Sequence, residues 1–312
     1  MANETTVDKE KNLVMTRNRQ IRSTPIEKLF TFLIYTILGI LGASCIIPFI
    51  HLIALSFSGS DPIKAGIVTL WPIEFNTDAY KYALDHPAFM RAFFISVMRV
   101  LVGVSFSLIM LVLTAYPLSK SNEACPLNPI FKVLMIIAML TGGGLIPMYL
   151  VMSWIGLTNT FWALVVPGML SLWNCFMVMN FFRNVPTELE EAAIVDGANS
   201  FQVMVRIYVP LSVPVIASMA LFTGVGHWND WFSGMLYMAR SRDYPLQTYL
   251  RQVVTTPNFS SLTIEEMQKY AQITSKNNQA AQIIIATVPI MCIYPFLQRY
   301  FMTGLTLGGV KG

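Results

Sequence analysis

The sequence predicts an all-α protein that crosses a membrane several times. Of its 312 residues, 54% are hydrophobic and only 12% are charged, and its mean hydropathy is positive. Long uncharged stretches also recur along the chain. A soluble globular chain of this length needs fewer apolar residues, and a helix of about 20 apolar residues spans the hydrocarbon of a bilayer. The fold class is therefore a polytopic helical membrane protein.

The uncharged stretches divide into six spans. Residues 29–60 carry no charge, and residues 92–119 are interrupted only by Arg99. The run 133–182 has 50 residues without a charge, which as one helix would be about 75 Å long, so the chain must fold back within it. The break is indicated by TGGGLIP and GLTNT, with a short helix expected at 146–155 on the outer surface. The spans are predicted at about 29–57, 92–118, 130–145, 160–182, 210–237 and 279–300.

The glycines of the break, Gly142 to Gly144, have two interpretations. They form a flexible joint or allow close backbone packing, or they simply end a helix at the outer surface. A phosphate-binding loop is excluded because no lysine follows them, and such a loop needs GxxxxGK and then Ser or Thr. We therefore expect no ATP hydrolysis by this chain.

The distribution of Lys and Arg predicts the orientation. With residues 1–28 inside, the inner segments carry 12 of these residues and the outer segments carry eight, as the positive-inside rule requires. No small-residue cleavage site follows the arm 1–28, so it is not expected to be a removable signal peptide. We expect a multi-pass membrane protein, with an arm at 1–28, a six-span membrane domain at 29–302, a tail at 303–312 and both termini in the cytoplasm.

The composition argues against other partners and sites. The net charge of +4 is small and is not clustered, which does not favour nucleic acid. The four cysteines have no CxxC spacing, and the three histidines form no ligand cluster, so no metal site is expected.

The cytoplasmic segment 184–210 is predicted to be a helix, a turn and a second helix. Pro186 suits a first helical turn, and the acids that follow it favour the positive end of the helix dipole. Gly197 suits a left-handed turn. Asn199 and Gln202 have the spacing of a capping box. Large apolar side chains then recur at helical spacing as one stripe: Phe201, Met204, Val205 and Tyr208.

This segment resembles the EAA loop of permeases of binding-protein-dependent ABC importers. The motif positions are Glu191, Ala192, Ala193, Asp196, Gly197, Ala198, Ile207 and Pro210. Further stretches, such as HWNDWF at 227–232 and the ending at 294–312, are similar to the carbohydrate-uptake permeases, particularly the LplC-like subgroup of maltose-type importers. Met204 departs from the family, which usually has Phe there.

The resemblance implies a six-helix type I importer permease of a bacterial cell (inner) membrane, with residues 29–302 as the permease domain. It implies uptake of oligosaccharides or polysaccharide fragments by alternating access. The implied partners are a second permease in a heterodimer, two ATPase subunits that bind ATP and Mg, and an extracytoplasmic solute-binding protein; no cofactor is implied in this chain. The resemblance also implies that the loop binds in a groove of the ATPase. Its implied coupling residues are Glu190, Glu191, Ala192, Ala193, Asp196, Gly197, Phe201 and Met204.

Polar and aromatic residues at membrane depth are candidates for the solute pathway. The alternative is that the amides bridge helices and the tryptophans belong to an interfacial belt. Arg99 could extend outward to water or pair with an acid of a partner chain. The pathway candidates are Tyr149, Trp173, Asn174, Asn180, Trp228, Asn229 and Asp230.

Two other classes of function compete. A secondary transporter or channel for small solutes would need no ATPase, and the loop would be a connector. Coupling to an ion gradient favours acids deep in the spans, and none of the predicted spans has an acid at its centre. An intramembrane enzyme would need a catalytic constellation, and no serine, aspartate or metal arrangement has a credible spacing.

Overall fold

The structure is a computed structural model, and it describes residues 24–254 and 276–309. These residues are mostly helical, and the described part contains no strand. The contacts divide the chain into two units, Met1–Leu52 and Ile53–Gly312. The predicted arm 1–28 lies almost wholly outside the described residues, and so does the end of the tail.

In its described part, the first unit consists of most of helix α2 (Pro25–Ser56). A reciprocal pair of hydrogen bonds starts the helix: the Thr24 backbone N–H donates to Glu27 Oε2 at 2.8 Å, and the Glu27 N–H donates to Thr24 Oγ1 at 3.3 Å. This is a capping box. The 32 residues of α2 extend about 48 Å, and they include almost all of the first predicted span.

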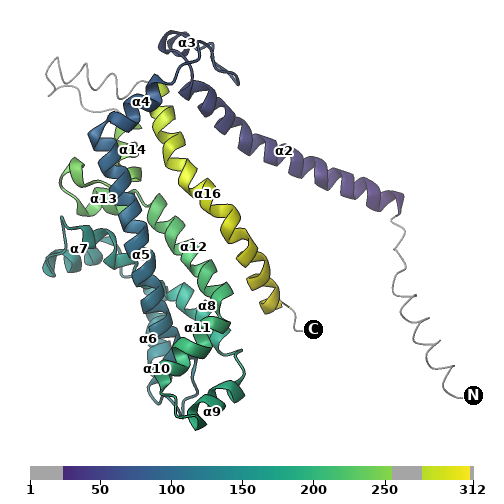
Figure 1. Ribbon diagram of the computed structural model, residues 1–312, viewed down its shortest axis with the longest axis vertical. Helices are drawn as coiled ribbons and strands as arrows, with labels where there is room; N and C mark the ends of the chain where they lie inside the picture. The colour runs from purple at the N-terminus through teal and green to yellow at the C-terminus, as the bar shows by residue number, and fades with distance from the viewer. Residues whose placement is uncertain (1–23, 255–275, 310–312) are drawn as a thin grey trace, which may run out of the picture. The chain divides into compact units, whose positions relative to one another are not determined.

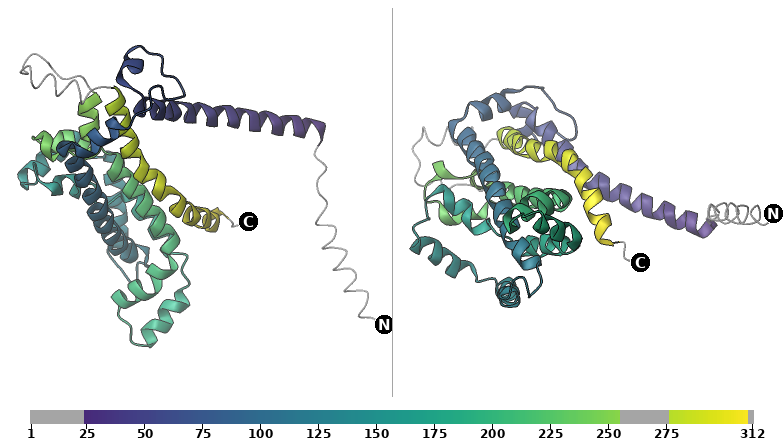
Figure 2. Two further views of the ribbon diagram at one scale, coloured as in Figure 1. Left: turned by 45° about the horizontal axis from the view of Figure 1, so that its top comes forward. Right: turned by 60° about the horizontal axis from the view of Figure 1, so that its bottom comes forward.

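The second unit is built around α5 (Pro87–Ser119), which packs against α8 (Leu172–Phe182) and α12 (Val213–Asn229). On its other side α12 packs against α16 (Lys276–Gly309). Figures 1 and 2 show these helices side by side. The buried face of α5 consists largely of small residues, which let neighbouring helices approach closely: Ala92, Ser96, Gly103, Ser107 and Ala115.

Short helices lie at the two ends of this unit (Figure 1). Around the N-terminal half of α5 are α4 (Asp78–Asp85), α13 (Phe232–Tyr237) and α14 (Leu246–Val254). At the other end are α9 (Thr187–Val195) and α10 (Ser200–Val203). The remaining elements are α3 (Ser60–Lys64), η1 (Phe161–Leu164), η2 (Val166–Gly168), η3 (Met204–Tyr208), α11 (Val209–Leu211) and η4 (Ser241–Asp243).

The predicted break in the long uncharged run is confirmed. Helix α6 (Asn128–Thr141) ends at Gly142, and α7 (Leu145–Trp154) leaves at 116° to it. Gly142, Gly143 and Gly144 all have positive φ, and a Cβ on Gly142 or Gly143 would meet no atom within 4 Å. These glycines therefore end a helix and turn the chain, and within the described residues Gly142 and Gly143 pack closely against no other helix.

The predicted fourth and fifth spans are not continuous helices. The fourth consists of η1, η2 and α8, with a bend of 47° before α8. The helix of the fifth stops at Asn229, because the Asp230 carboxylate accepts hydrogen bonds from the N–H groups of Phe232 and Ser233 and so starts α13. In the described part, two helices are long and apolar enough to span a membrane, and up to five spans result if each bent pair counts as one.

Candidate functional site

The segment between α8 and α12 forms the predicted helix, turn and helix. Gly197 has φ +83°, in the left-handed region that glycine adopts without a side-chain clash. The capping box of α10 is also confirmed. The Asn199 side chain accepts from the Gln202 N–H at 2.9 Å, and Gln202 Oε1 accepts from the Asn199 N–H at 3.0 Å. The sharp bend is therefore specified by local sequence.

The two helices of this loop expose apolar side chains to solvent. Val195 is 87% exposed, Phe201 62% and Ile194 56%. Among the expected coupling residues, Glu191, Ala192, Asp196 and Gly197 are also exposed, whereas Ala193 is half-buried and packs against the core of this end. An apolar surface of this kind on a polar element is typical of a protein interface.

The predicted apolar stripe is divided between surface and core. Phe201 and Val205 are exposed, but Met204 and Tyr208 are buried, at 5% and 3% exposure. Both pack with Phe182 on α8. The chain forms a π-helix over Met204–Tyr208, which changes the spacing from that of an α-helix, and sequence periodicity did not indicate this. Of the two large apolar residues among the implied coupling residues, Phe201 and Met204, only Phe201 lies on the surface.

Glu190 lies in a cluster of three elements at this end of the unit. Its Oε2 accepts from Lys120 Nζ at 2.6 Å and from the Tyr208 hydroxyl at 2.7 Å. Lys120 Nζ also lies 3.9 Å from the ring centroid of Tyr208 and 4.3 Å from that of Tyr116. We call Glu190, Lys120, Tyr208 and Tyr116 the latch. It joins α9 to the end of α5 and to the π-helix.

The electrostatics of the latch favour a charged Glu190. Partial burial by itself raises the pKa of the Glu190 carboxyl, but the hydrogen bonds from Lys120 and Tyr208 and the charge of Lys120 outweigh it. The net pKa lies below the ordinary value, because all three interactions stabilise the carboxylate. The ion pair is therefore intact at neutral pH.

A second feature is a polar cavity of about 540 Å³ between α5, η1, η2, α8 and α12. We call it the central cavity. Two of the residues predicted for the solute pathway, Asn174 and Asp230, line it. The other polar or charged lining residues are Arg99, Ser171, Thr223, His227 and Ser233.

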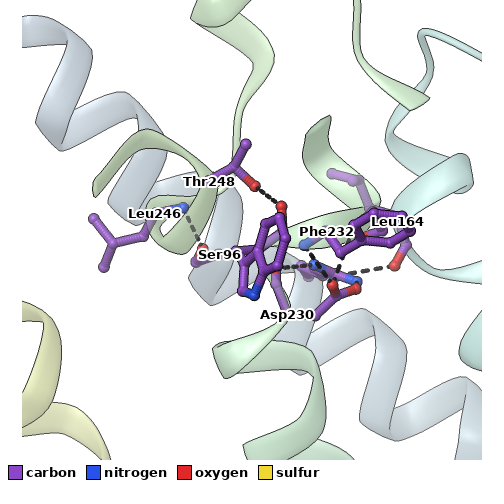
Figure 3. Close-up of polar contacts among 9 residues, drawn as sticks. Ser96, Leu164, Asp230, Phe232, Leu246 and Thr248 are labelled. Atoms are coloured by element: carbon purple, nitrogen blue, oxygen red, sulfur yellow. Dashed lines mark hydrogen bonds and ion pairs between the residues drawn. The ribbon is translucent and has the colours of Figure 1, made fainter. Parts of the chain in front are cut away.

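Arg99 and Asp230 form an ion pair at the wall of this cavity. Arg99 Nη2 lies 2.5 Å from Asp230 Oδ2, and Arg99 also donates to the backbone carbonyls of Asp230 at 3.1 Å and of Leu164 at 2.9 Å. Figure 3 shows Asp230 with the Leu164 carbonyl and the Phe232 backbone. The Arg99 side chain is only 3% exposed. Both expectations for Arg99, extension to water and pairing with a partner chain, are therefore wrong; its acid lies 131 residues away in the same chain.

His227 lies beside this pair in a slot made by two glycines. A Cβ on Gly103 would meet His227 Nε2 at 2.6 Å, and one on Gly168 would meet its Cε1 at 3.1 Å. Side chains larger than glycine therefore cannot occupy these positions without a shift of the imidazole. The three segments α5, η2 and α12 can meet here because α5 and η2 each place a glycine, which has no side chain, against His227.

The other pathway candidates do not line the central cavity. Trp228 is buried on another side of α12, where its indole donates to the Ala286 carbonyl at 3.1 Å. Tyr149 stacks on Tyr237, with ring centroids 6.2 Å apart. Trp173, Asn180 and Asn229 are exposed. The structure therefore brings together only two of the seven candidates.

The described residues contain no group of His, Cys, Asp and Glu that could hold a metal ion. The four cysteines are free thiols, and Cys45 and Cys292 are exposed in the single chain.

Comparison with known proteins is consistent with this geometry. Residues 125–306 match the family described as binding-protein-dependent transport system inner membrane component. Protein LplC of Bacillus subtilis (strain 168) is 40% identical over 275 residues, covering 88% of this chain and 92% of that protein. The polygalacturonan/rhamnogalacturonan transport system permease protein YtcP of the same organism is 35% identical, covering 91% of this chain and 99% of that protein.

A solved structure also matches. It is a crystal structure of a bacterial ABC transporter involved in the import of the acidic polysaccharide alginate, at 26% sequence identity and a TM-score of 0.81. The match covers 89% of this chain and 98% of that chain.

Proposed function

Because this chain belongs to the family of binding-protein-dependent transport system inner membrane components, we propose that it is a permease subunit of an ATP-driven importer of oligosaccharides or polysaccharide fragments. Its relatives include permeases for polygalacturonan/rhamnogalacturonan and for maltodextrin in Bacillus subtilis. The chain is a multi-pass membrane protein and the non-catalytic part of the transport complex. Solute crosses by alternating access.

The observation that carries this function is the loop formed by α9, Gly197 and α10. It leaves the helical unit at one end, bends sharply at a glycine and exposes the apolar side chains of Ile194, Val195 and Phe201. Such a surface fits a groove in a separate protein. In the proposed complex that protein is the ATPase, which binds ATP and Mg. Glu191 and Asp196 contribute polar contacts at the rim.

The latch gives this loop a mechanical connection to the membrane helices. Movement of α9 acts on α8 through the chain itself, and it also acts on α5 through the Glu190–Lys120 ion pair, whose side chains are 21% and 14% exposed. Because α5 packs against both α8 and α12, force applied at the loop reaches the walls of the central cavity. Glu190 therefore acts inside the permease, while Glu191 faces the ATPase.

We propose six spans, with both termini and the α9–α10 loop on the cytoplasmic side. The excess of Lys and Arg in the inner segments supports this orientation. The end of the unit with α4, α13 and α14 then faces outward, where a solute-binding protein docks. A second permease and two ATPase subunits complete the assembly.

The test is purification of the tagged chain in mild detergent, with identification of the proteins that accompany it, and then Gly197→Val in the reconstituted complex. Valine is strained at φ +83°, so we expect substrate uptake and transport-linked ATP hydrolysis to fall while membrane insertion persists. The matched control is Gly66→Val, because Gly66 has φ +71° and similar open space around it but lies outside the loop. Wild-type chain that transports its solute with no ATPase present would support the secondary transporter instead.

A further inference from the structure

The central cavity has the size and the chemistry of a ligand site. Its volume of about 540 Å³ lies in the range of small-molecule pockets. Polar side chains that line a cavity between membrane helices are costly unless they serve a function. The lining includes two hydroxyl groups and an amide, which are side chains that can form hydrogen bonds with a solute: Ser171, Thr223 and Asn174.

These groups have hydrogen-bonding capacity left. In the described part of the chain the Asn174 side chain makes one hydrogen bond, a long one of 3.5 Å from its amide nitrogen to Thr223 Oγ1. The Asn174 carbonyl oxygen can therefore accept a further bond. Asp230 is 32% exposed, so part of its carboxylate is accessible to a hydrogen-bond donor in the cavity.

The charges of the cavity cancel. Its charged lining residues are Arg99 and Asp230, and these are paired at 2.5 Å. Arg99 cannot turn toward a new anion without losing its bonds to Asp230 and to the Leu164 carbonyl. An anionic solute would also meet the Asp230 carboxylate after leaving water, which is unfavourable for a charge without a partner. A hydroxyl group has neither cost and can donate to that carboxylate.

We propose that the central cavity is a subsite for an uncharged, hydroxyl-bearing sugar residue of the transported oligosaccharide. Asn174, Thr223 and Asp230 bind its hydroxyl groups, and Phe222, which is 49% exposed at the same cavity, packs against its C–H face. The inference rests on the proposed function and adds a substrate class to it. That class differs from the acidic polysaccharide named for the structural relative.

The experiment measures equilibrium binding of radiolabelled trisaccharides to the purified permease and ATPase complex without the solute-binding protein. The probes are neutral trisaccharides of glucose, xylose and galactose, together with the corresponding uronate trisaccharides. We expect a neutral probe to bind and the uronates to bind at least tenfold more weakly. Tighter binding of the uronates, or no binding of any neutral probe, would overturn the subsite.

Two near-isosteric variants locate the binding. Asn174→Leu and Thr223→Val each remove hydrogen-bonding groups, and each should weaken binding of the neutral probe about two- to tenfold, as expected for one hydrogen bond. The control is Thr287→Val, because the Thr287 hydroxyl bonds to its own helix at Ile283 O and does not line the cavity. Equal binding by all three variants and the wild type would refute the assignment.

Uptake in vesicles that also contain the solute-binding protein separates the two proposals. If the wild-type complex takes up no oligosaccharide, the proposed function fails. If it takes up oligosaccharide and the Asn174→Leu and Thr223→Val variants do so equally well, only the subsite fails.

Discussion

Replacement of Arg99 by methionine tests whether the buried ion pair stabilises the helical unit. Methionine preserves much of the volume of the side-chain stem but leaves the Asp230 carboxylate without its cation. Removal of one partner of a buried pair costs about 3–5 kcal/mol. Because Asp230 is 32% exposed and keeps its bonds to the N–H groups of Phe232 and Ser233, we expect the lower end of that range, about 3 kcal/mol.

The matched control lies on the same helix. Arg91 pairs with Asp243 at 3.2 Å, but its side chain is 54% exposed, so Arg91→Met should cost about 0–1 kcal/mol. The converse change, Asp230→Asn, should cost more than Arg99→Met because it leaves the 3% exposed arginine uncompensated. The double variant of Arg99 and Asp230 should be less unstable than the sum of the two single variants.

The assay is unfolding of the purified chain in mixed micelles of dodecyl maltoside and increasing SDS, followed by circular dichroism. Two results would refute the reasoning. One is that Arg99→Met and Arg91→Met agree within about 0.5 kcal/mol, the usual range for surface substitutions. The other is that the single effects at residues 99 and 230 add without coupling, which is the behaviour of independent sites.

Three further predictions concern the latch and the histidine slot. Glu190→Gln should leave the complex assembled but lower the solute transported per ATP hydrolysed, and amine-reactive labelling of Lys120 should rise; unchanged coupling would show that the latch transmits no force. The pKa of Glu190 is lowered from 4.5, so the latch stabilises the fold at pH values above 4.5 and loses this effect only as the pH falls through the lowered pKa. Between pH 8 and pH 6 the ion pair should therefore stay intact. The rate of Lys120 labelling should change over this range no more than the rate for a free amine does. Gly103→Ala should lower the stability by about 1–3 kcal/mol, because the added methyl group overpacks against His227. The control, Gly224→Ala, should be tolerated because its Cβ would lie 3.5 Å from the nearest atom. Equal melting temperatures of the two variants would contradict the slot.

The loop was predictable because its signals are local. The left-handed turn at Gly197 and the capping box at Asn199 and Gln202 each depend on residues within a few positions of one another, so the sequence alone indicates them. The break at Gly142 to Gly144 was predictable for a related reason. An uncharged run much longer than one bilayer crossing has to turn, and the glycines supply the backbone conformation.

Burial within the loop was less predictable. Helical periodicity placed Phe201, Met204 and Tyr208 on one stripe, but the π-helix at Met204–Tyr208 turns two of them into the core. Glu190 and Glu191 are adjacent acids in the sequence, and nothing local indicates which of them faces inward. That choice depends on Lys120, which lies 70 residues away.

The sequence by itself determined the membrane environment, most of the helices and the family. The reason is that the lengths of apolar runs, the helix caps, the turns and the motif spacing are properties of residues close together in the chain. Only the tertiary structure decided that Arg99 meets Asp230, that Trp228 lies in the core, and that Asn174 and Thr223 face one cavity. Each of these contacts joins helices far apart in the chain. Their distances are set by how closely small residues such as Gly103 and Gly168 let the helices approach, and a one-dimensional pattern does not contain that information.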